Sequence, residues 1–126
     1  MNSKSKISII RKKLSNLIQR KNKLLFHLID GKPMIYGFPY KLFKTCGKPT
    51  CKCARGEKHG PYPALSVCRE GKQKIVMIRK EDHFIIFEQA KRSQNFQKIV
   101  ADIRKINIEI DELLKQYKES ATREYE

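Results

Sequence analysis

Three cysteines and a histidine lie close together in the segment CGKPTCKCARGEKHGPY, residues 46–62. Cys46, Cys51, Cys53 and His59 have the spacing C-x4-C-x-C-x5-H. Thiolate and imidazole are preferred zinc ligands, and three cysteines with one histidine form a recognised tetrahedral set. The glycines and prolines of the segment favour turns, so a short loop can fold around an ion. We therefore predict a structural zinc ion held by these four residues.

Two features of the segment leave other interpretations open. The C-x-C spacing is tight, and the pattern differs from the paired C-x2-C knuckles of many zinc sites. The alternatives are a glycine-rich turn with reduced thiols, in which His59 hydrogen-bonds the loop backbone, and a redox or other metal role. The fourth cysteine, Cys68, falls on an expected strand. We expect Cys68 to be a small core residue on this strand. The alternative is that Cys68 replaces His59 as the fourth metal ligand.

No catalytic constellation is recognisable in the sequence. His27 and His83 have no partner at a metal-ligand spacing such as H-x-H or H-E-x-x-H, and the chain contains no G-x-S-x-G or Walker loop. Four protein ligands would also fill every position on zinc and leave none for water. Glu57, near His59, is interpreted as a solvated loop charge. We predict that the protein is not an enzyme.

The charge of the chain indicates a polyanionic partner. Lys and Arg number 28 against 13 Asp and Glu, which gives a net charge of +15. Nucleic acid is the first expectation, DNA more than RNA, and an anionic membrane surface is the second. Basic side chains that can neutralise phosphates gather on the Cys-rich loop and the following hairpin. The predicted nucleic-acid-binding residues are Lys44, Lys48, Lys52, Arg55, Lys58, Arg69, Lys72 and Lys74.

Two long helices are expected to flank this segment. Apolar residues at heptad spacing predict a helix over residues 3–29, with Lys21 at one seam position, and the sequence DGKP ends it. A second heptad seam predicts a helix over residues 81–118, followed by a frayed tail at 119–126. The first seam comprises Ile7, Ile10, Leu14, Leu17, Leu24 and Leu28, and the second comprises Phe96, Ile99, Ile103, Ile106, Ile110, Leu113 and Tyr117.

The middle of the chain, residues 32–80, is expected to form a small β module. Strand-forming residues flank the sequence REGK, residues 69–72, and predict a hairpin whose turn contains Gly71. The aromatic segment at 33–45 contains Pro39 and is expected to add either an edge strand or an irregular lead-in, and with the edge strand the sheet has three strands. The predicted fold is therefore α+β, a single domain in which a coiled-coil-like helical hairpin carries a small sheet and the Cys-rich loop.

Self-association is expected through the long helices. The first seam is shorter and interrupted by Lys21, so a strip around Ile106, Ile110 and Leu113 is expected to face water. Exposed apolar strips of this kind mark interfaces, and a homodimer is the commonest way to cover one. The alternative to the dimer is a monomeric hairpin. The alternative to nucleic-acid binding is an assembly module that docks a partner such as a transposase.

The sequence indicates a cytoplasmic protein. No apolar run is long enough to span a bilayer, and the N-terminus lacks the features of a secretory signal. In the cytoplasm thiols stay reduced, which favours metal ligation over disulfide bonds. A DNA-binding protein of this kind would be associated with the nucleoid.

The segment CGKPTCKCARGEKHGPYPALSVCREGKQKIVMI resembles an uncharacterised family of short bacterial proteins often found with transposases, phages and other mobile elements. The family signature reads approximately C-G-K-P-x-C-x-C-A-x-G-x-x-H-G-P-Y, followed by two strands and a helical tail. The resemblance covers residues 43–80 closely and the last helix more loosely. The sequence departs from the family at Cys68, where a large residue is usual. Membership implies an accessory or regulatory role in mobile-element biology and no established activity.

Overall fold

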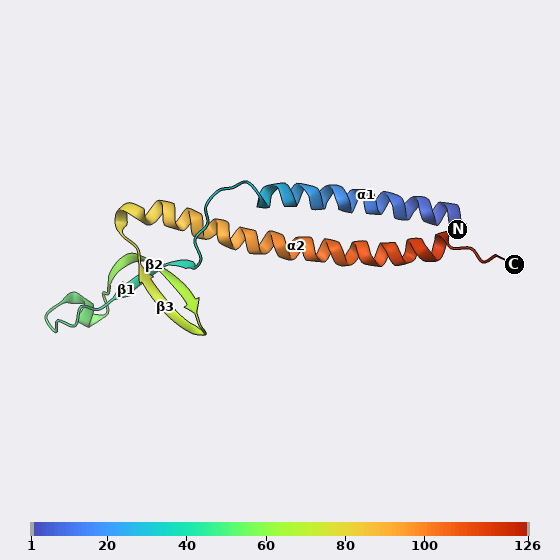
Figure 1. Cartoon of the computed structure of the whole chain (residues 1–126). Helices are drawn as coiled ribbons and strands as arrows, with labels where there is room; N and C mark the ends of the chain where they lie inside the picture. Colours follow the sequence, from blue (N-terminus) through green and yellow to red (C-terminus); the bar gives the residue numbers. More distant parts are fainter. Residues whose placement is uncertain (1, 126) are drawn as a thin grey trace. The chain divides into compact units, whose positions relative to one another are not determined.

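The computed structural model describes residues 2–125, which form two long helices and a three-stranded antiparallel sheet (Figure 1). This architecture confirms the predicted α+β class. In chain order the elements are α1 (Ser3–Leu28), β1 (Phe38–Lys44), the 3-10 helix η1 (Lys52–Arg55), β2 (His59–Arg69), β3 (Lys72–Met77), the 3-10 helix η2 (Lys80–Asp82) and α2 (His83–Ala121). The chain divides into a helical unit, residues up to 32 and from 96 onward, and a sheet unit, residues 33–95.

The first helix buries the side that its heptads predict. α1 begins after Asn2, whose side chain accepts a hydrogen bond from the Ser5 N–H at 2.9 Å, as expected of an N-cap residue. Every described position of α1 outside the seam is exposed, including the basic residues. Lys21 is half-buried, which its long aliphatic stem allows while the ammonium group reaches water. The buried or half-buried positions are Ile7, Ile10, Leu14, Leu17, Lys21, Leu24 and Leu28.

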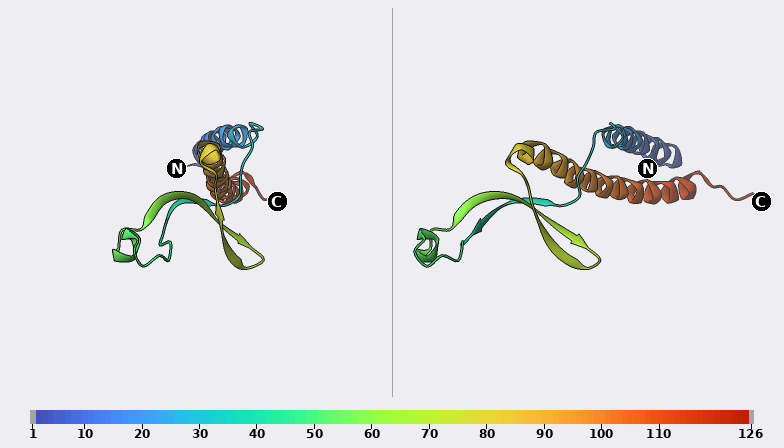
Figure 2. Two further views of the ribbon diagram at one scale, coloured as in Figure 1. Left: turned by 90° about the vertical axis from the view of Figure 1, so that its left-hand side faces the viewer. Right: turned by 60° about the vertical axis from the view of Figure 1, so that its left-hand side comes forward.

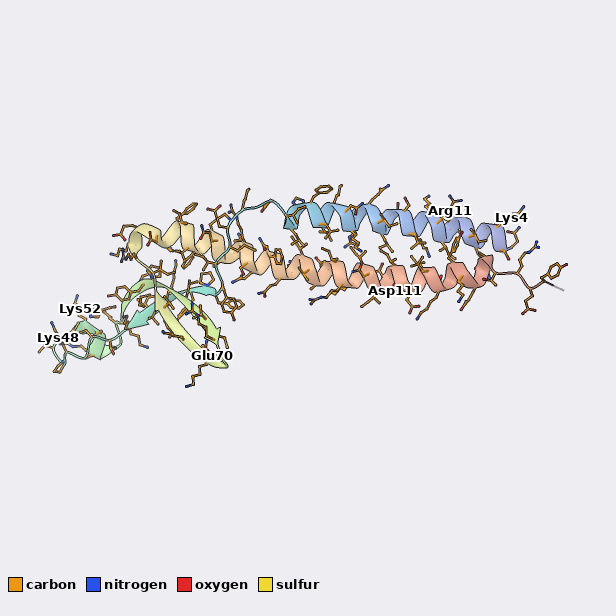
Figure 3. All side chains as sticks on the ribbon, viewed as in Figure 1. Lys4, Arg11, Lys48, Lys52, Glu70 and Asp111 are labelled. Atoms are coloured by element: carbon orange, nitrogen blue, oxygen red, sulfur yellow. The ribbon has the colours of Figure 1, made fainter. Side chains whose placement is uncertain are left out.

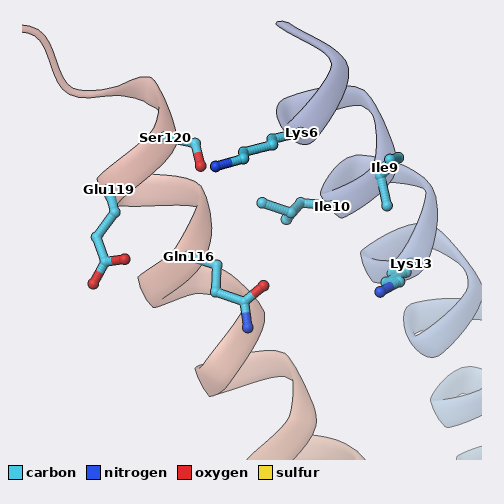
Figure 4. A pocket seen from close by; sticks show the side chains of 7 residues that line it. All are labelled: Lys6, Ile9, Ile10, Lys13, Gln116, Glu119 and Ser120. Carbon is cyan, nitrogen blue, oxygen red and sulfur yellow. The ribbon is translucent and has the colours of Figure 1, made fainter. Parts of the chain in front are cut away.

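In the helical unit, the two helices pack as an antiparallel hairpin. Residues near the start of α1 and the end of α2 line one shallow pocket (Figure 4). Ile10 points toward α2 in this view, and the Lys6 ammonium group extends toward Ser120. Ile10 is buried on α1, as are Ile103 and Ile106 on α2.

Within residues 2–125, neither long helix combines the length and the apolarity needed to cross a bilayer.

The prediction that an apolar strip around Ile106, Ile110 and Leu113 faces water is wrong. Ile106 is only 3 % exposed, and Ile110 and Leu113 are half-buried. The reason is length, because α1 has 26 residues and the part of α2 in the same unit, residues 96–121, is equally long. A hairpin of matched helices covers its own seam. The large apolar side chains that remain exposed on the hairpin include Ile18, Leu114 and Tyr117.

The sheet unit has a small core on one face of the sheet. The strand order is β1-β2-β3, and both pairings are antiparallel; Figure 2 shows the strands from two further sides. Leu65 and Val67 of β2 pack with Ala90 from the first turns of α2, and Ile35, Ile78 and Ile86 pack around them. The turn between β2 and β3 consists of Glu70 and Gly71, with φ values of 53° and 77°. Two positive φ values are typical of the two-residue turns whose twist matches the strands.

Two isoleucines on α2 give a direct test of the hairpin. Ile106→Ala should lower the free energy of unfolding by about 2–4 kcal/mol, because it empties buried space in the seam. Ile108→Ala removes the same atoms from a side chain that is 63 % exposed and should cost about 0.5 kcal/mol or less. Urea denaturation followed by circular dichroism measures both. Equal effects of the two changes would contradict the helix packing.

Candidate metal centre

The Cys-rich loop is closed at its base by the pairing of β1 with β2. Lys44, the last residue of β1, pairs with His59, the first residue of β2. A register shift between Leu42 and Lys44 brings these two residues opposite each other. Gly60 has φ +134°, and a Cβ there would lie 2.7 Å from the Leu42 carbonyl oxygen, so the close approach of the strands requires glycine. Cys46 follows β1 by two residues and therefore lies near His59.

The 3-10 helix η1 places the other two cysteines. Cys51 is the N-cap residue of η1, and its backbone N–H donates to the Lys48 carbonyl at 3.1 Å. Cys53 lies inside η1 and is buried. Gly56, with φ +104°, ends η1 by donating its backbone N–H to the Cys53 carbonyl at 3.3 Å. The short helix thus turns Cys51 and Cys53 back toward the strand ends.

The four predicted ligands form one cluster. One ligand atom from each of Cys46, Cys51, Cys53 and His59 lies within 4.8 Å of all the others. Cys46 Sγ and Cys53 Sγ are 3.4 Å apart, and Cys51 Sγ and His59 Nε2 are 3.1 Å apart. All four cysteines of the chain are free thiols. The chain therefore carries a Cys3His cluster that is positioned to hold a metal ion.

The size of the cluster fits tetrahedral zinc. Bonds of about 2.3 Å to sulfur and about 2.0 Å to nitrogen set the ligand atoms about 3.5–3.8 Å apart. The Cys46–Cys53 and Cys51–His59 separations lie a few tenths of an ångström below that range, and no separation exceeds it by more than about 1 Å. Small side-chain rotations are enough to complete the tetrahedron.

Backbone N–H groups support negative charge on the cysteines. A hydrogen bond from the Lys48 backbone N–H lowers the pKa of Cys46, and a further hydrogen bond with Cys53 adds to this effect. The Cys46 backbone N–H donates to Cys53 Sγ at 3.3 Å, which by itself lowers the pKa of Cys53. Burial and the neighbouring Cys46 and Cys51 outweigh that bond, so the pKa of Cys53 is raised overall. Thiolates crowded in this way are stabilised by a cation among them.

The structure places His59 inside the ligand cluster and Cys68 outside it. The His59 ring nitrogen lies against the thiol of Cys51 and not against the loop backbone. Cys68 is exposed near the far end of β2 and lies outside the cluster. The expectation that Cys68 is a core residue is wrong, because its side chain points to the face of the sheet opposite Leu65 and Val67. Its carbonyl oxygen accepts a hydrogen bond from the Tyr36 hydroxyl at 3.1 Å.

The predicted nucleic-acid-binding residues are all exposed, but they form two groups and not one. β2 is 11 residues long, so the loop and the β2–β3 turn are separated by about 30 Å along the strand. Figure 3 shows Lys48 and Lys52 at one end of the sheet unit and Glu70 at the other. The loop group comprises Lys44, Lys48, Lys52, Arg55 and Lys58, and the turn group comprises Arg69, Lys72 and Lys74.

The backbone of Lys48 has a role that its charged side chain does not predict. Its N–H hydrogen-bonds Cys46, which requires a tight turn, and Gly47 has φ +79° to make it. The sequence signal for this role is the tripeptide Cys46-Gly47-Lys48, because glycine directly after a cysteine permits a left-handed turn beneath the sulfur.

Comparison with known proteins gives a family for the chain. The family model described as "Domain of unknown function (DUF6788)" matches residues 6–85, more than half of the chain. The matched region contains most of α1, the whole sheet and the Cys3His cluster, and it ends at the start of α2. A search of curated proteins and a search of solved structures found no match.

Two cysteine variants test the metal centre. Cys51→Ser should reduce bound metal from one ion per chain to none, because three ligands hold zinc far more weakly than four. Helical circular dichroism should be largely retained, since α1 and α2 contain no ligand. Cys68→Ser is the matched control and should keep the metal. Elemental analysis of freshly reduced protein measures the content, and full metal binding by Cys51→Ser would contradict the ligand assignment.

Proposed function

We propose that this chain, which belongs to the DUF6788 family, is a zinc-stabilised module that binds nucleic acid. The observation that carries the proposal is the loop group of five cations displayed around the metal cluster. Glu57 is the only acidic residue between Lys44 and His59. Within residues 2–125, none of the five cationic side chains forms an ion pair. They are therefore available to phosphates.

In this proposal the metal has a structural role. The four protein ligands would occupy all tetrahedral positions and leave none for a reactive water, which supports the proposal that the protein is not an enzyme. Zinc would instead fix a loop with few apolar contacts, in which Cys53 is the only buried residue between residues 45 and 58. A fixed loop presents its lysines and arginine in one geometry and loses less conformational entropy on binding than a mobile loop.

The loop also contains a cation held in place by an aromatic ring. Lys44 Nζ lies 5.5 Å from the centre of the Tyr62 ring. Such a cation–π contact positions the ammonium group at the base of the loop.

DNA is the proposed polyanion. The proposed biological setting is an accessory role beside a transposase or another mobile-element protein.

Charge reversal on the loop tests this function. Arg55→Glu with Lys58→Glu should weaken binding to a DNA duplex strongly and reduce the slope of log K against log salt by about 2, one for each lost phosphate contact. Lys98→Glu with Lys105→Glu changes the net charge equally at two exposed positions on α2. This control should have a much smaller effect. Fluorescence anisotropy across a salt series measures both. Absence of binding by the unaltered protein at low salt would contradict the proposal.

A second candidate function is assembly through the helical unit. A groove of about 560 Å³ on the helical hairpin is lined by apolar and polar side chains from both helices. Ile18, Leu114 and Tyr117 border it and are 49 %, 50 % and 37 % exposed. Apolar surface at a groove is suited to a second copy of the same hairpin, which would complete a four-helix bundle. A homodimer of this kind would present two basic loops to nucleic acid.

The dimer is tested at this groove. Light scattering across a concentration series should give a dimer mass for the unaltered protein, and Leu114→Lys should yield a folded monomer, because a charge cannot be buried unpaired at the interface. Ile108→Lys is the control on another face of α2 and should leave the dimer intact. A monomer mass for the unaltered protein at high concentration would rule the dimer out.

A further inference from the structure

The face of the sheet opposite the small core carries aromatic and apolar side chains. Residues paired across antiparallel strands point to the same face, and successive residues alternate between faces. Leu65 and Val67 point to the core, so Ala64 and Ser66 of β2 point away from it, together with their partners. We call this surface the outer face. Its members are Phe38, Tyr40 and Leu42 of β1, Tyr62, Ala64, Ser66 and Cys68 of β2, and Gln73, Ile75 and Met77 of β3.

The outer face exposes large apolar side chains on β1 and β3, whereas Ala64 at its centre is buried. Phe38 is 67 % exposed, Ile75 is 52 % exposed and Met77 is 44 % exposed. A shallow groove of about 560 Å³ crosses the face between β1 and β3, and Phe38, Tyr40, Ser66, Gln73 and Ile75 line it. Ser66 and Gln73 add polar groups to this floor, joined by a hydrogen bond from Gln73 Nε2 to Ser66 Oγ at 2.6 Å. The groove thus combines flat apolar surface with groups that can bond the edge of a base.

The spacing of the aromatic rings favours one kind of nucleic acid. Phe38 and Tyr40 are two residues apart on one strand, which sets their Cα atoms about 6.6 Å apart. Neighbouring bases in a duplex rise by only about 3.4 Å, and both of their faces are already stacked. Bases of an extended single strand have free faces and can spread to this spacing. Sheet surfaces with exposed aromatic side chains bind unpaired bases in this way.

Positive charge lies at both ends of the sheet, but only one end adds it to the outer face. The loop group begins at one end, where Lys44 Nζ lies 5.5 Å from the centre of the ring of the outer-face residue Tyr62. At the other end Arg69, Lys72 and Lys74 alternate with Cys68 and Gln73 and therefore start from the core face. Residues 38–77 contain nine Lys and Arg against two acidic residues. A strand that crosses the aromatic groove would therefore meet the cations of the loop group at one end of it. This positive charge favours a polyanion over an apolar protein segment as the occupant of the groove.

We propose that the outer face binds single-stranded nucleic acid, with unpaired bases stacked on Phe38 and Tyr40 and the phosphates beyond Tyr62 neutralised by the loop group. This inference rests on the proposed nucleic-acid binding and narrows its ligand to unpaired strands. Ser66 and Gln73 contact the edges of the stacked bases.

The absence of tryptophan from the sequence provides a specific probe. Phe38→Trp places a single indole on the outer face, and titration with an oligothymidylate should quench its fluorescence as bases stack on it. Phe84→Trp places the indole on α2, at a position that is 78 % exposed and outside the outer face, and should show little quenching. A duplex with the same number of phosphates should quench neither. Equal quenching of the two variants would overturn the stacking.

Affinity gives the second measurement. Phe38→Ala should weaken binding of the oligothymidylate by about 5- to 150-fold, the range expected for losing one stacked base. Phe84→Ala should bind like the unaltered protein. Because Phe38 is mostly exposed, its replacement should preserve the fold, which circular dichroism checks, and Phe38→Trp should restore affinity.

The outcomes separate this inference from the function on which it rests. Salt-dependent binding that Arg55→Glu with Lys58→Glu weakens but Phe38→Ala does not would overturn the single-strand inference and leave the loop function standing. A preference for the duplex over the single strand would have the same consequence. Failure of the unaltered protein to bind either nucleic acid would overturn both.

Discussion

The candidate metal centre depends on the pairing between the end of β1 and the start of β2. This ladder sets Lys44 opposite His59 and so brings Cys46 and His59 together although they are 13 positions apart in the sequence. η1 then has only to turn Cys51 and Cys53 inward. Closing a loop costs conformational entropy, and the pairing of the two strands offsets part of that cost. The four ligand atoms lie within 4.8 Å of one another at the end of this ladder.

A bound ion would in turn stabilise the sheet unit. Its buried apolar core consists of Leu65, Val67 and Ala90, with a few half-buried neighbours. Cores of this size give small units little stability, and such units commonly gain it from a structural metal. The loop and the core lie on the same strand, β2, so anchoring His59 at one end of the strand also supports its pairing with both neighbours. Metal site and sheet therefore support each other.

Much of the fold followed from the sequence because its periodic patterns are local. The heptad seams predicted the buried side of α1 position by position, including Lys21, and Gly71 predicted the β2–β3 turn. The ligand set followed from residue type and spacing.

Strand register could not be predicted from residue type and spacing. It separates the basic residues into two groups, and it places Phe38, Tyr40, Ile75 and Met77 on one face. The alternation Phe38-Tyr40-Leu42 carried a weak signal of that face, but the partner strands became known only from the pairing. Helix coverage also required the structure, because the exposed strip depended on how far α1 extends beside α2.

Native mass spectrometry of the reduced protein, purified without added metal, tests the central claim that a metal ion organises the loop. The predicted result is a mass that exceeds the bare chain by one zinc ion per chain, and this excess should disappear under acidic denaturing conditions as the thiolates and the imidazole are protonated. The same spectrum reports the number of chains and any nucleic acid that copurifies. A freshly reduced, folded protein with the mass of the bare chain would contradict the claim.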